Sequence, residues 1–289
     1  MIRNHFLIKI THNTHMKQLF KTLSFAAILA IAVTSCKKDV KEQPKQDEVS
    51  EETLNQIKAL GFYNGGVKKV DGGYLVEGDI LLSENDLKSK PNSQSLVIAN
   101  EEHYRTNNLV NTSTYATIRV ALNNSSSTHQ AVFSAALDEA IRRYNALGLR
   151  IRFSRVTSSP HTTVRAYYQV SNTLGSAGFP TSSGAPYSQV QMNTYHYSTS
   201  TSATNVNYIA TIMAHELGHC IGFRHTDYMN RAYSCGGAYS NEGASTVGAV
   251  HIPGTPTGAS ANSWMLACVG SGVNRPFTSA DLTALNYVY

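Results

Sequence analysis

The histidine spacing between residues 215 and 225 constrains this chain of 289 residues more than any other feature. The segment reads HELGHCIGFRH, in which His215 and His219 are four residues apart. On a helix this spacing places one side chain a turn above the other, so both imidazoles can bind the same metal ion. Gly222 can take the left-handed conformation that ends a helix and turn the chain so that His225 reaches the same ion. The sequence therefore predicts a helix that ends in a three-histidine metal site.

Glu216 lies directly beside the first of these histidines. A carboxylate in that position can take a proton from a water at the metal, which is what a general base does in hydrolysis. Three protein ligands leave one position open, as in catalytic zinc, whereas structural zinc has four protein ligands. Two core histidines, or a zinc that only stabilises the fold, are alternatives that explain the carboxylate less well. The pattern indicates a hydrolytic site that holds one zinc ion.

These residues resemble the extended signature of the metzincin zinc metallopeptidases, HExxHxxGxxH. The segment HELGHCIGFRHTD, the IPGTP at 252–256 and the terminal FTSADLTALNYVY look most like the bacterial dual-action HEIGH metallopeptidase family, although Leu217 replaces the isoleucine of that name. The resemblance covers roughly residues 112–289. It implies zinc ligands at His215, His219 and His225, with Glu216 as the catalytic base of an endopeptidase.

The same resemblance implies an α+β fold. We expect a twisted, mostly parallel sheet, an active-site helix at the floor of a cleft and a smaller lower subdomain. It also implies that the predicted strand 188–193 is the sheet edge along which an extended peptide substrate lies.

Several further site residues follow from the resemblance. Met265 in NSWMLA matches the methionine turn beneath the metal, with Met229 as an alternative that follows His225 closely. Astacins and serralysins have a tyrosine two residues after this methionine, where this chain has Ala267. A replacement tyrosine would come from the loop that contains Tyr228, Tyr233 and Tyr239. Asp227 could orient a metal ligand or close a loop turn, and both interpretations stay open.

Upstream, the segment VEGDI at 76–80 resembles the FxGD segment of astacin propeptides, with Val76 in place of phenylalanine. In those propeptides the aspartate caps the zinc. By analogy Asp79 would be a latency switch of a zymogen, and the small unit before residue 110 its prosegment. The alternative is that these residues only form a turn at a strand end.

The N-terminal segment has the features of an export signal. Residues 23–33 are apolar and follow Lys17 and Lys21, which suits a signal peptide and is too short for a membrane span. The run ends in VTSC, which resembles a bacterial lipobox with Cys36 as the lipidated residue. A start at Met16 would give the usual signal proportions. We therefore expect an exported lipoprotein of the bacterial cell envelope, at the outer membrane or cell surface, which processing could release.

Composition divides the chain into four parts. These are a signal peptide with lipobox (1–36), a charged tether (37–52), a prosegment (53–110) and a catalytic domain (111–289). Helices are expected at 54–62, 208–221 and 278–289 and from a Thr128 cap to Gly148, and strands at 72–82, 117–123, 149–153, 163–170 and 188–193. Residues 226–262 read as a long loop.

Charge and cysteine content limit the partners. Residues 110–289 contain ten arginines and six acidic residues, a net charge of +4 without a basic cluster, so nucleic-acid binding is not expected. The partners expected are protein or peptide substrates, with membrane contact only through the lipid anchor, and the chain is expected to be a monomer. Cys235 and Cys268 lie in loop-like sequence and are the predicted disulfide, whereas Cys220 lies in a helical pattern. The alternatives to a peptidase are a non-proteolytic surface lipoprotein whose zinc cleft binds a partner, and an interaction module with tyrosine-rich loops.

Overall fold

The computed structural model describes residues 48–88, 103–123, 127–243, 247–256 and 259–289. The expected signal peptide, Cys36 and most of the tether lie outside these ranges. No helix within them combines the length and apolar character that crossing a bilayer requires.

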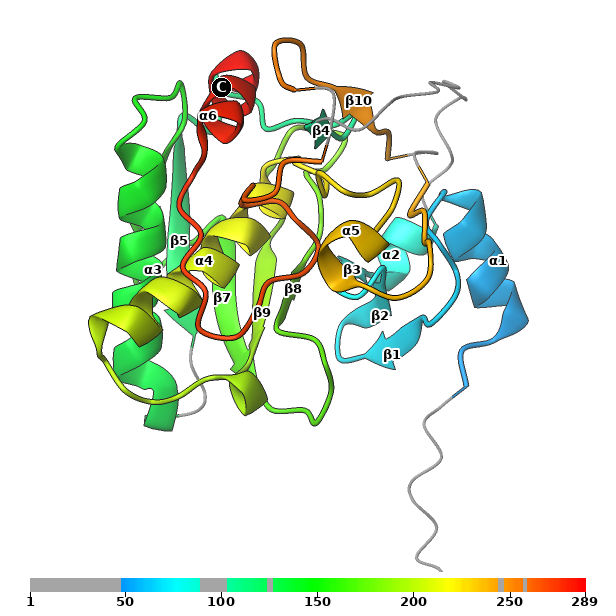
Figure 1. The fold of residues 1–289 in the computed structure, drawn as a ribbon, viewed down its shortest axis with the longest axis horizontal. Coiled ribbons are helices and arrows are strands. Elements are labelled where there is room, and N and C mark those ends of the chain that lie inside the picture. Colours follow the sequence, from blue (N-terminus) through cyan, green and yellow to red (C-terminus); the bar gives the residue numbers. More distant parts are fainter. Residues whose placement is uncertain (1–47, 89–102, 124–126, 244–246, 257–258) are drawn as a thin grey trace, which may run out of the picture. The chain divides into compact units, whose positions relative to one another are not determined.

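An eight-stranded mixed sheet runs through the described residues in the order β1-β2-β3-β8-β9-β7-β5-β6 (Figure 1). Five of its strands come from the C-terminal part: β5 (Thr117–Asn123), β6 (Arg152–Arg155), β7 (Thr162–Tyr167), β8 (Gly175–Ala177) and β9 (Gln189–Asn193). Strands β6, β5, β7 and β9 pair in parallel, and β8 lies antiparallel to β9. The expected α+β fold with a mostly parallel catalytic sheet is confirmed.

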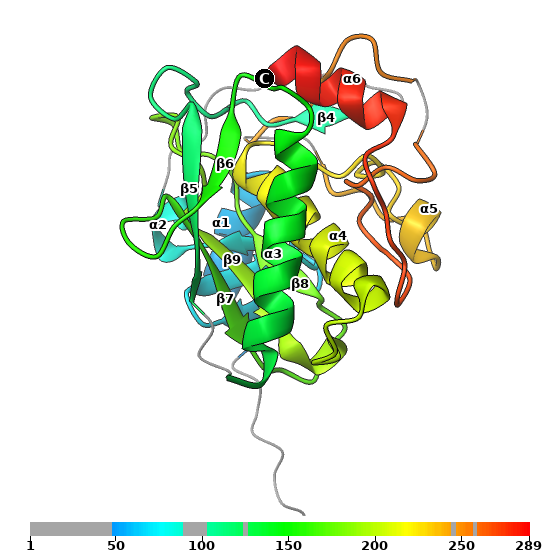
Figure 2. The ribbon, with the colours of Figure 1, turned by 90° about the vertical axis from the view of Figure 1, so that its left-hand side faces the viewer.

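Helices α3 (Gln130–Asn145) and α4 (Ala203–Cys220) cover one face of this sheet (Figure 2). The side chains of α3 that were expected on one face, among them Phe133, Leu137 and Tyr144, are buried in the main core. The helix begins two residues after the expected cap, because residues Ser127–His129 form a separate 3-10 turn, η1. The last helix of this part is α6 (Ser279–Val288), which Thr278 caps through its side chain.

Helix α4 is buried from Tyr208 to Cys220 on all sides, since it lies between the sheet and the C-terminal loops. It begins five residues earlier than expected, where the side chain of Ser202 accepts a hydrogen bond from Asn205 N. Gly222 follows its end with φ +104°, and a Cβ there would lie 2.9 Å from Leu109 Cδ2. Both the conformation and the space therefore require glycine at this turn.

The N-terminal unit has its own small core and two short helices. Its elements are α1 (Glu51–Ala59), β1 (Lys68–Val70), β2 (Gly73–Val76), β3 (Ile80–Leu82) and α2 (Glu84–Leu87). The single strand expected at 72–82 is wrong. Glu77 and Gly78 have φ +54° and +93°, so the chain turns there and β2 pairs antiparallel with β3.

The expected position of the sheet edge is also wrong. Strand β9 lies between β7 and β8, and β8 in turn pairs in parallel with β3, where Ile80 lies opposite Ala177. Strand β8 consists of Gly-Ser-Ala, so it has no apolar alternation that the sequence could reveal. Its position depends on pairing with distant residues.

The loop at 226–262 contains two short elements, α5 (Ala232–Cys235) and β10 (Val250–His251). Strand β10 pairs with β4 (Tyr104–Arg105), which comes directly before the C-terminal sheet in sequence. This second sheet joins the loop after α4 to the segment that precedes β5.

Candidate metal centre

Three histidine side chains meet at the end of α4. His215 and His219 lie on consecutive turns of the helix, and the turn at Gly222 returns His225 to them. The Nε2 of His219 lies 3.0 Å from that of His215 and 3.2 Å from that of His225, and the third pair is 3.3 Å apart. All three rings are buried. The structure thus brings together the three residues that the sequence predicted as ligands.

The other ring nitrogen of each histidine faces a hydrogen-bond acceptor. The Nδ1 atoms of His215, His219 and His225 bond the Trp264 carbonyl at 2.8 Å, the Phe223 carbonyl at 2.8 Å and Glu242 Oε1 at 2.7 Å. Because a carbonyl can only accept, the Nδ1 of the first two must carry the proton. Their Nε2 lone pairs then point at one another, and a cation is the group that satisfies them. The residues present therefore fit a metal ion.

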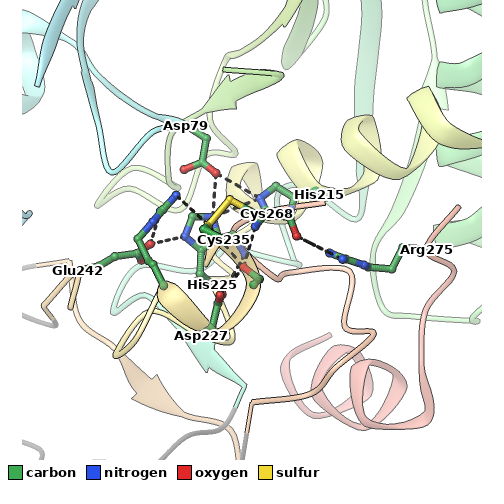
Figure 3. Close-up of a disulfide and its surroundings, with 11 residues drawn as sticks. Asp79, His215, His225, Asp227, Cys235, Glu242, Cys268 and Arg275 are labelled. Atoms are coloured by element: carbon green, nitrogen blue, oxygen red, sulfur yellow. Dashed lines mark hydrogen bonds and ion pairs between the residues drawn. A yellow bond between two sulfur atoms is a disulfide. The ribbon is translucent and has the colours of Figure 1, made fainter. Parts of the chain in front are cut away.

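Asp79 is the fourth member of this cluster (Figure 3). Its Oδ2 lies 3.0 Å from His225 Nε2 and 3.7 Å from His215 Nε2. Burial acts to raise the pKa of Asp79, but the two histidines outweigh it and hold this pKa well below its usual value. The EGD segment thus forms a turn, and that turn carries Asp79 to the histidines.

The cluster shifts the pKa values of two of its histidines in opposite directions. Burial lowers the pKa of His219, as do the two imidazoles beside it. Burial also opposes protonation of His225, but the carboxylates of Asp79 and Glu242 outweigh it and raise the pKa of this histidine.

Glu216 lies beside the cluster without a partner for one of its oxygens. The side chain is buried, and Oε2 accepts no hydrogen bond within the described part of the chain. Burial raises the pKa of Glu216 well above the usual value, and the charge of Asp79 adds to this. A Cβ at Gly175 would lie 2.8 Å from Glu216 Oε1, so β8 passes directly against this carboxylate. The Glu216 carboxyl group thus lies next to both the metal site and strand β8.

Met265 packs beneath the helix that bears the histidines. A Cβ at Gly218 would lie 2.6 Å from the Met265 sulfur, so glycine is needed for this contact. Met265 is fully buried, and its carbonyl accepts a hydrogen bond from Thr226 N at 2.9 Å. Met229, the alternative, packs instead against a separate cluster that contains Tyr104 and Tyr228.

Asp227 closes a loop and does not orient a histidine. Its carboxylate accepts hydrogen bonds from Ala267 N at 2.9 Å and from Ser234 Oγ at 2.5 Å. The disulfide between Cys235 and Cys268 joins the same two segments, with an S–S distance of 2.10 Å (Figure 3). Of the two interpretations of Asp227, these contacts agree with the one in which it closes a loop turn.

Glu242 is the carboxylate that holds a histidine, and sequence reasoning missed it. Besides His225 Nδ1 it accepts from Arg231 Nη1 at 2.5 Å, and its Oε2 lies 3.5 Å from Arg224 Nη2. Arg224 also lies 3.3 Å from Glu77, whose pKa burial and Glu242 raise to about 8. Glu242 follows His225 by seventeen residues in a glycine-rich loop, where no motif marks it.

A cavity of about 360 Å³ opens beside the cluster. Its walls include His215, Glu216, Gly175 and Asp79. The tyrosines Tyr228, Tyr233 and Tyr239 are not among its lining residues: the first is buried against Tyr104, and the other two are 49% and 70% exposed. The structure therefore does not bring the loop tyrosines to this cavity.

A family model described as dual-action HEIGH metallo-peptidase matches residues 74–289. The chain belongs to this family. It is therefore a metallopeptidase. The match begins within β2, upstream of the range that the sequence resemblance indicated, so it includes Asp79.

Two solved structures are similar to this metallopeptidase. Myroilysin is 18% identical with a TM-score of 0.37, over 60% of this chain and 90% of its own. High choriolytic enzyme 1, a hatching enzyme zinc-protease from Oryzias latipes (Medaka fish), is 15% identical with a TM-score of 0.34, over 60% of this chain and 89% of its own. No curated protein matches the sequence significantly.

Proposed function

We propose that this metallopeptidase is a zinc endopeptidase in which His215, His219 and His225 hold one zinc ion and Glu216 is the general base. The observation that carries the proposal is the convergence of three Nε2 atoms within 3.3 Å while each Nδ1 is fixed by an acceptor. Three imidazoles with an open position are the donor set of catalytic zinc. A zinc ion bound there would polarise the scissile carbonyl and lower the pKa of water.

Glu216 would move the proton in this reaction. It takes a proton from the attacking water and gives it to the leaving nitrogen of the substrate. Its burial and its unpartnered Oε2 support this role, since both make it a better proton acceptor. A substrate strand would pair with the β8 edge next to this carboxylate, in the way that extended peptides extend a sheet.

The N-terminal unit would act as a prosegment that keeps the enzyme latent. Strand β3 pairs with β8 and so covers the edge that a substrate strand would use. Asp79 at the turn before β3 would occupy the open metal position. Removal of the unit at 53–110 would clear both the edge and the metal.

The function is tested with the full chain after it has been allowed to mature, in parent and Glu216→Gln forms. Zinc content is measured by mass spectrometry and cleavage on casein. We expect equal zinc in both forms and cleavage by the parent alone, with a loss of about 10²-fold or more in the variant. Zinc without cleavage by the matured parent would favour a lipoprotein whose cleft binds a partner.

Latency is tested by Asp79→Ala, which should shorten the lag before cleavage begins. Asp71→Ala is the matched control, because it removes an exposed carboxylate from the same unit. An equal lag in the parent and both variants would contradict the switch.

Export and anchoring follow from the N-terminal sequence. The mature chain would be a monomer held at the cell envelope through lipid on Cys36, and it would act on proteins or peptides there. Labelling with a radioactive fatty acid should mark the parent and not Cys36→Ser. Label in both forms would contradict anchoring at this residue.

A further inference from the structure

The cavity beside Glu216 has a second wall that the proposed chemistry does not use. Thr211 and Ile212 contribute to it one turn of α4 before His215. The segment at 266–269, which follows Met265, and Arg275 line the same cavity.

Arg275 has no acidic partner in this cavity. Its two Nη atoms donate to the Cys268 carbonyl at 3.2 and 3.3 Å, and no carboxylate of the described residues lies within 4.0 Å of it. Arg231 also lines the cavity but is paired with Glu242 at 2.5 Å. A guanidinium has five N–H donors, so about three remain available on Arg275. Partial burial lowers the pKa of this arginine, although the charges of Asp227 and Asp281 act in the opposite direction from beyond ion-pair distance.

The surrounding residues fix Arg275 in place. Its backbone N–H donates to Thr211 Oγ1 at 2.9 Å. The preceding residue, Asn274, accepts from the buried Arg143 at 2.9 Å, and Arg143 also donates to Thr211 Oγ1 at 3.3 Å. Cys268, which accepts from the guanidinium, is held by its disulfide. The guanidinium is therefore positioned before any ligand arrives, and this lowers the cost of binding one.

The cavity lies on one side of the metal centre. Glu216 and His215 line it, whereas His219 and His225 are not among its lining residues. Since Glu216 delivers its proton to the leaving nitrogen, the amine half of a substrate lies on the Glu216 side. The side chain that enters the cavity is then that of the residue after the cleaved bond.

We propose that this cavity binds an aspartate or glutamate side chain of the residue after the cleaved bond, with Arg275 as the specificity-determining residue. The proposal rests on the peptidase function proposed above. A carboxylate can accept two parallel N–H bonds from a guanidinium, and such charge-assisted pairs are about twice as strong as neutral hydrogen bonds. Lys68, the third cation at the cavity, belongs to the N-terminal unit and would leave with it.

The test compares kcat/KM of the matured full chain on fluorogenic peptides that differ only in the residue after the cleaved bond. The peptides carry Glu, Gln, Leu or Lys at that position. The variants are Arg275→Gln, which keeps a donor for the Cys268 carbonyl, and Arg275→Glu. Arg152→Gln is the control, because it removes the same charge from an exposed position on β6.

We expect the parent and the control to prefer Glu over Gln by about tenfold or more. In Arg275→Gln the rates on the Glu and Gln peptides should differ by less than about threefold, and Arg275→Glu should prefer Lys. Equal rates of the parent on Glu and Gln, or a preference that survives in Arg275→Gln, would overturn the inference. Casein is cleaved in parallel by the same preparations. Cleavage of casein without an acidic preference refutes the inference alone, whereas failure to cleave casein refutes the peptidase function and this inference with it.

Discussion

Helix α4 and the loop that follows it contribute to one metal centre in different ways. The helix supplies His215, His219 and Glu216 through local periodicity, because residues four apart share a face. The loop supplies His225 and its partner Glu242, and it depends on contacts between residues far apart in sequence. A sequence motif can encode the first contribution. The second exists only once the chain has folded.

The largest expected effect tests the helix. His219→Ala removes the histidine that lies closest to both others, so the zinc affinity should fall by more than the factor of 10 to 100 that losing a supporting carboxylate costs. Competition with a chelator measures the affinity. His196→Ala is the control, since His196 bonds the Ser171 carbonyl outside the cluster. Undiminished affinity in His219→Ala would place the metal elsewhere.

The next effect tests the loop. Glu242→Gln keeps an acceptor for His225 Nδ1 but removes the negative charge, and we expect zinc affinity to fall by about 10- to 100-fold. The same titration on Glu52→Gln, an exposed position of α1, should match the parent. If the zinc affinity of Glu242→Gln also equals that of the parent, the negative charge of Glu242 does not contribute to zinc binding.

The two regions differ in how well the sequence predicted them. The helix, its glycine turn and the cysteine pair were all expected, because periodicity, the conformational freedom of Gly222 and loop composition are local properties. Strand β8 and the role of Glu242 were not, because a Gly-Ser-Ala segment and an isolated loop glutamate have no local signal. A turn at Glu77 was one of two open interpretations, but the division of 72–82 into two paired strands was not expected, because it depends on the positive φ of Glu77 and Gly78.

A smaller effect concerns the covalent support of the loop. Replacing both Cys235 and Cys268 by serine should lower the free energy of unfolding by about 2 to 4 kcal/mol, because the bond limits the unfolded chain. Chemical denaturation of the parent with and without reductant provides the matched comparison. A stability equal to that of the oxidised parent would show that Asp227 and its hydrogen bonds hold the two segments without the disulfide.

The smallest effect comes from a purely local helical contact. Arg142 donates hydrogen bonds to Glu139. These bonds, together with Arg143, lower the pKa of Glu139 to about 2, although burial acts to raise it. Because this pKa is below the unfolded value of 4.5, the contribution is fully present above pH 4.5 and is lost as the pH falls towards 2. Glu139→Gln should therefore lower stability at pH 7 by less than about 1 kcal/mol. Chemical denaturation of the parent and of Glu139→Gln at several pH values measures this contribution. A difference in the free energy of unfolding between the two that grows as the pH falls would contradict the assignment.

The most direct test of the joint metal centre is a crystal structure of the zinc-loaded full chain, with anomalous diffraction recorded on both sides of the zinc edge. The account predicts one anomalous peak between the Nε2 atoms of His215, His219 and His225, with each Nδ1 bond retained. In the latent chain the Asp79 carboxylate should face the same peak. A peak away from these histidines, or zinc bound without His225, would contradict a centre that the helix and the loop build together.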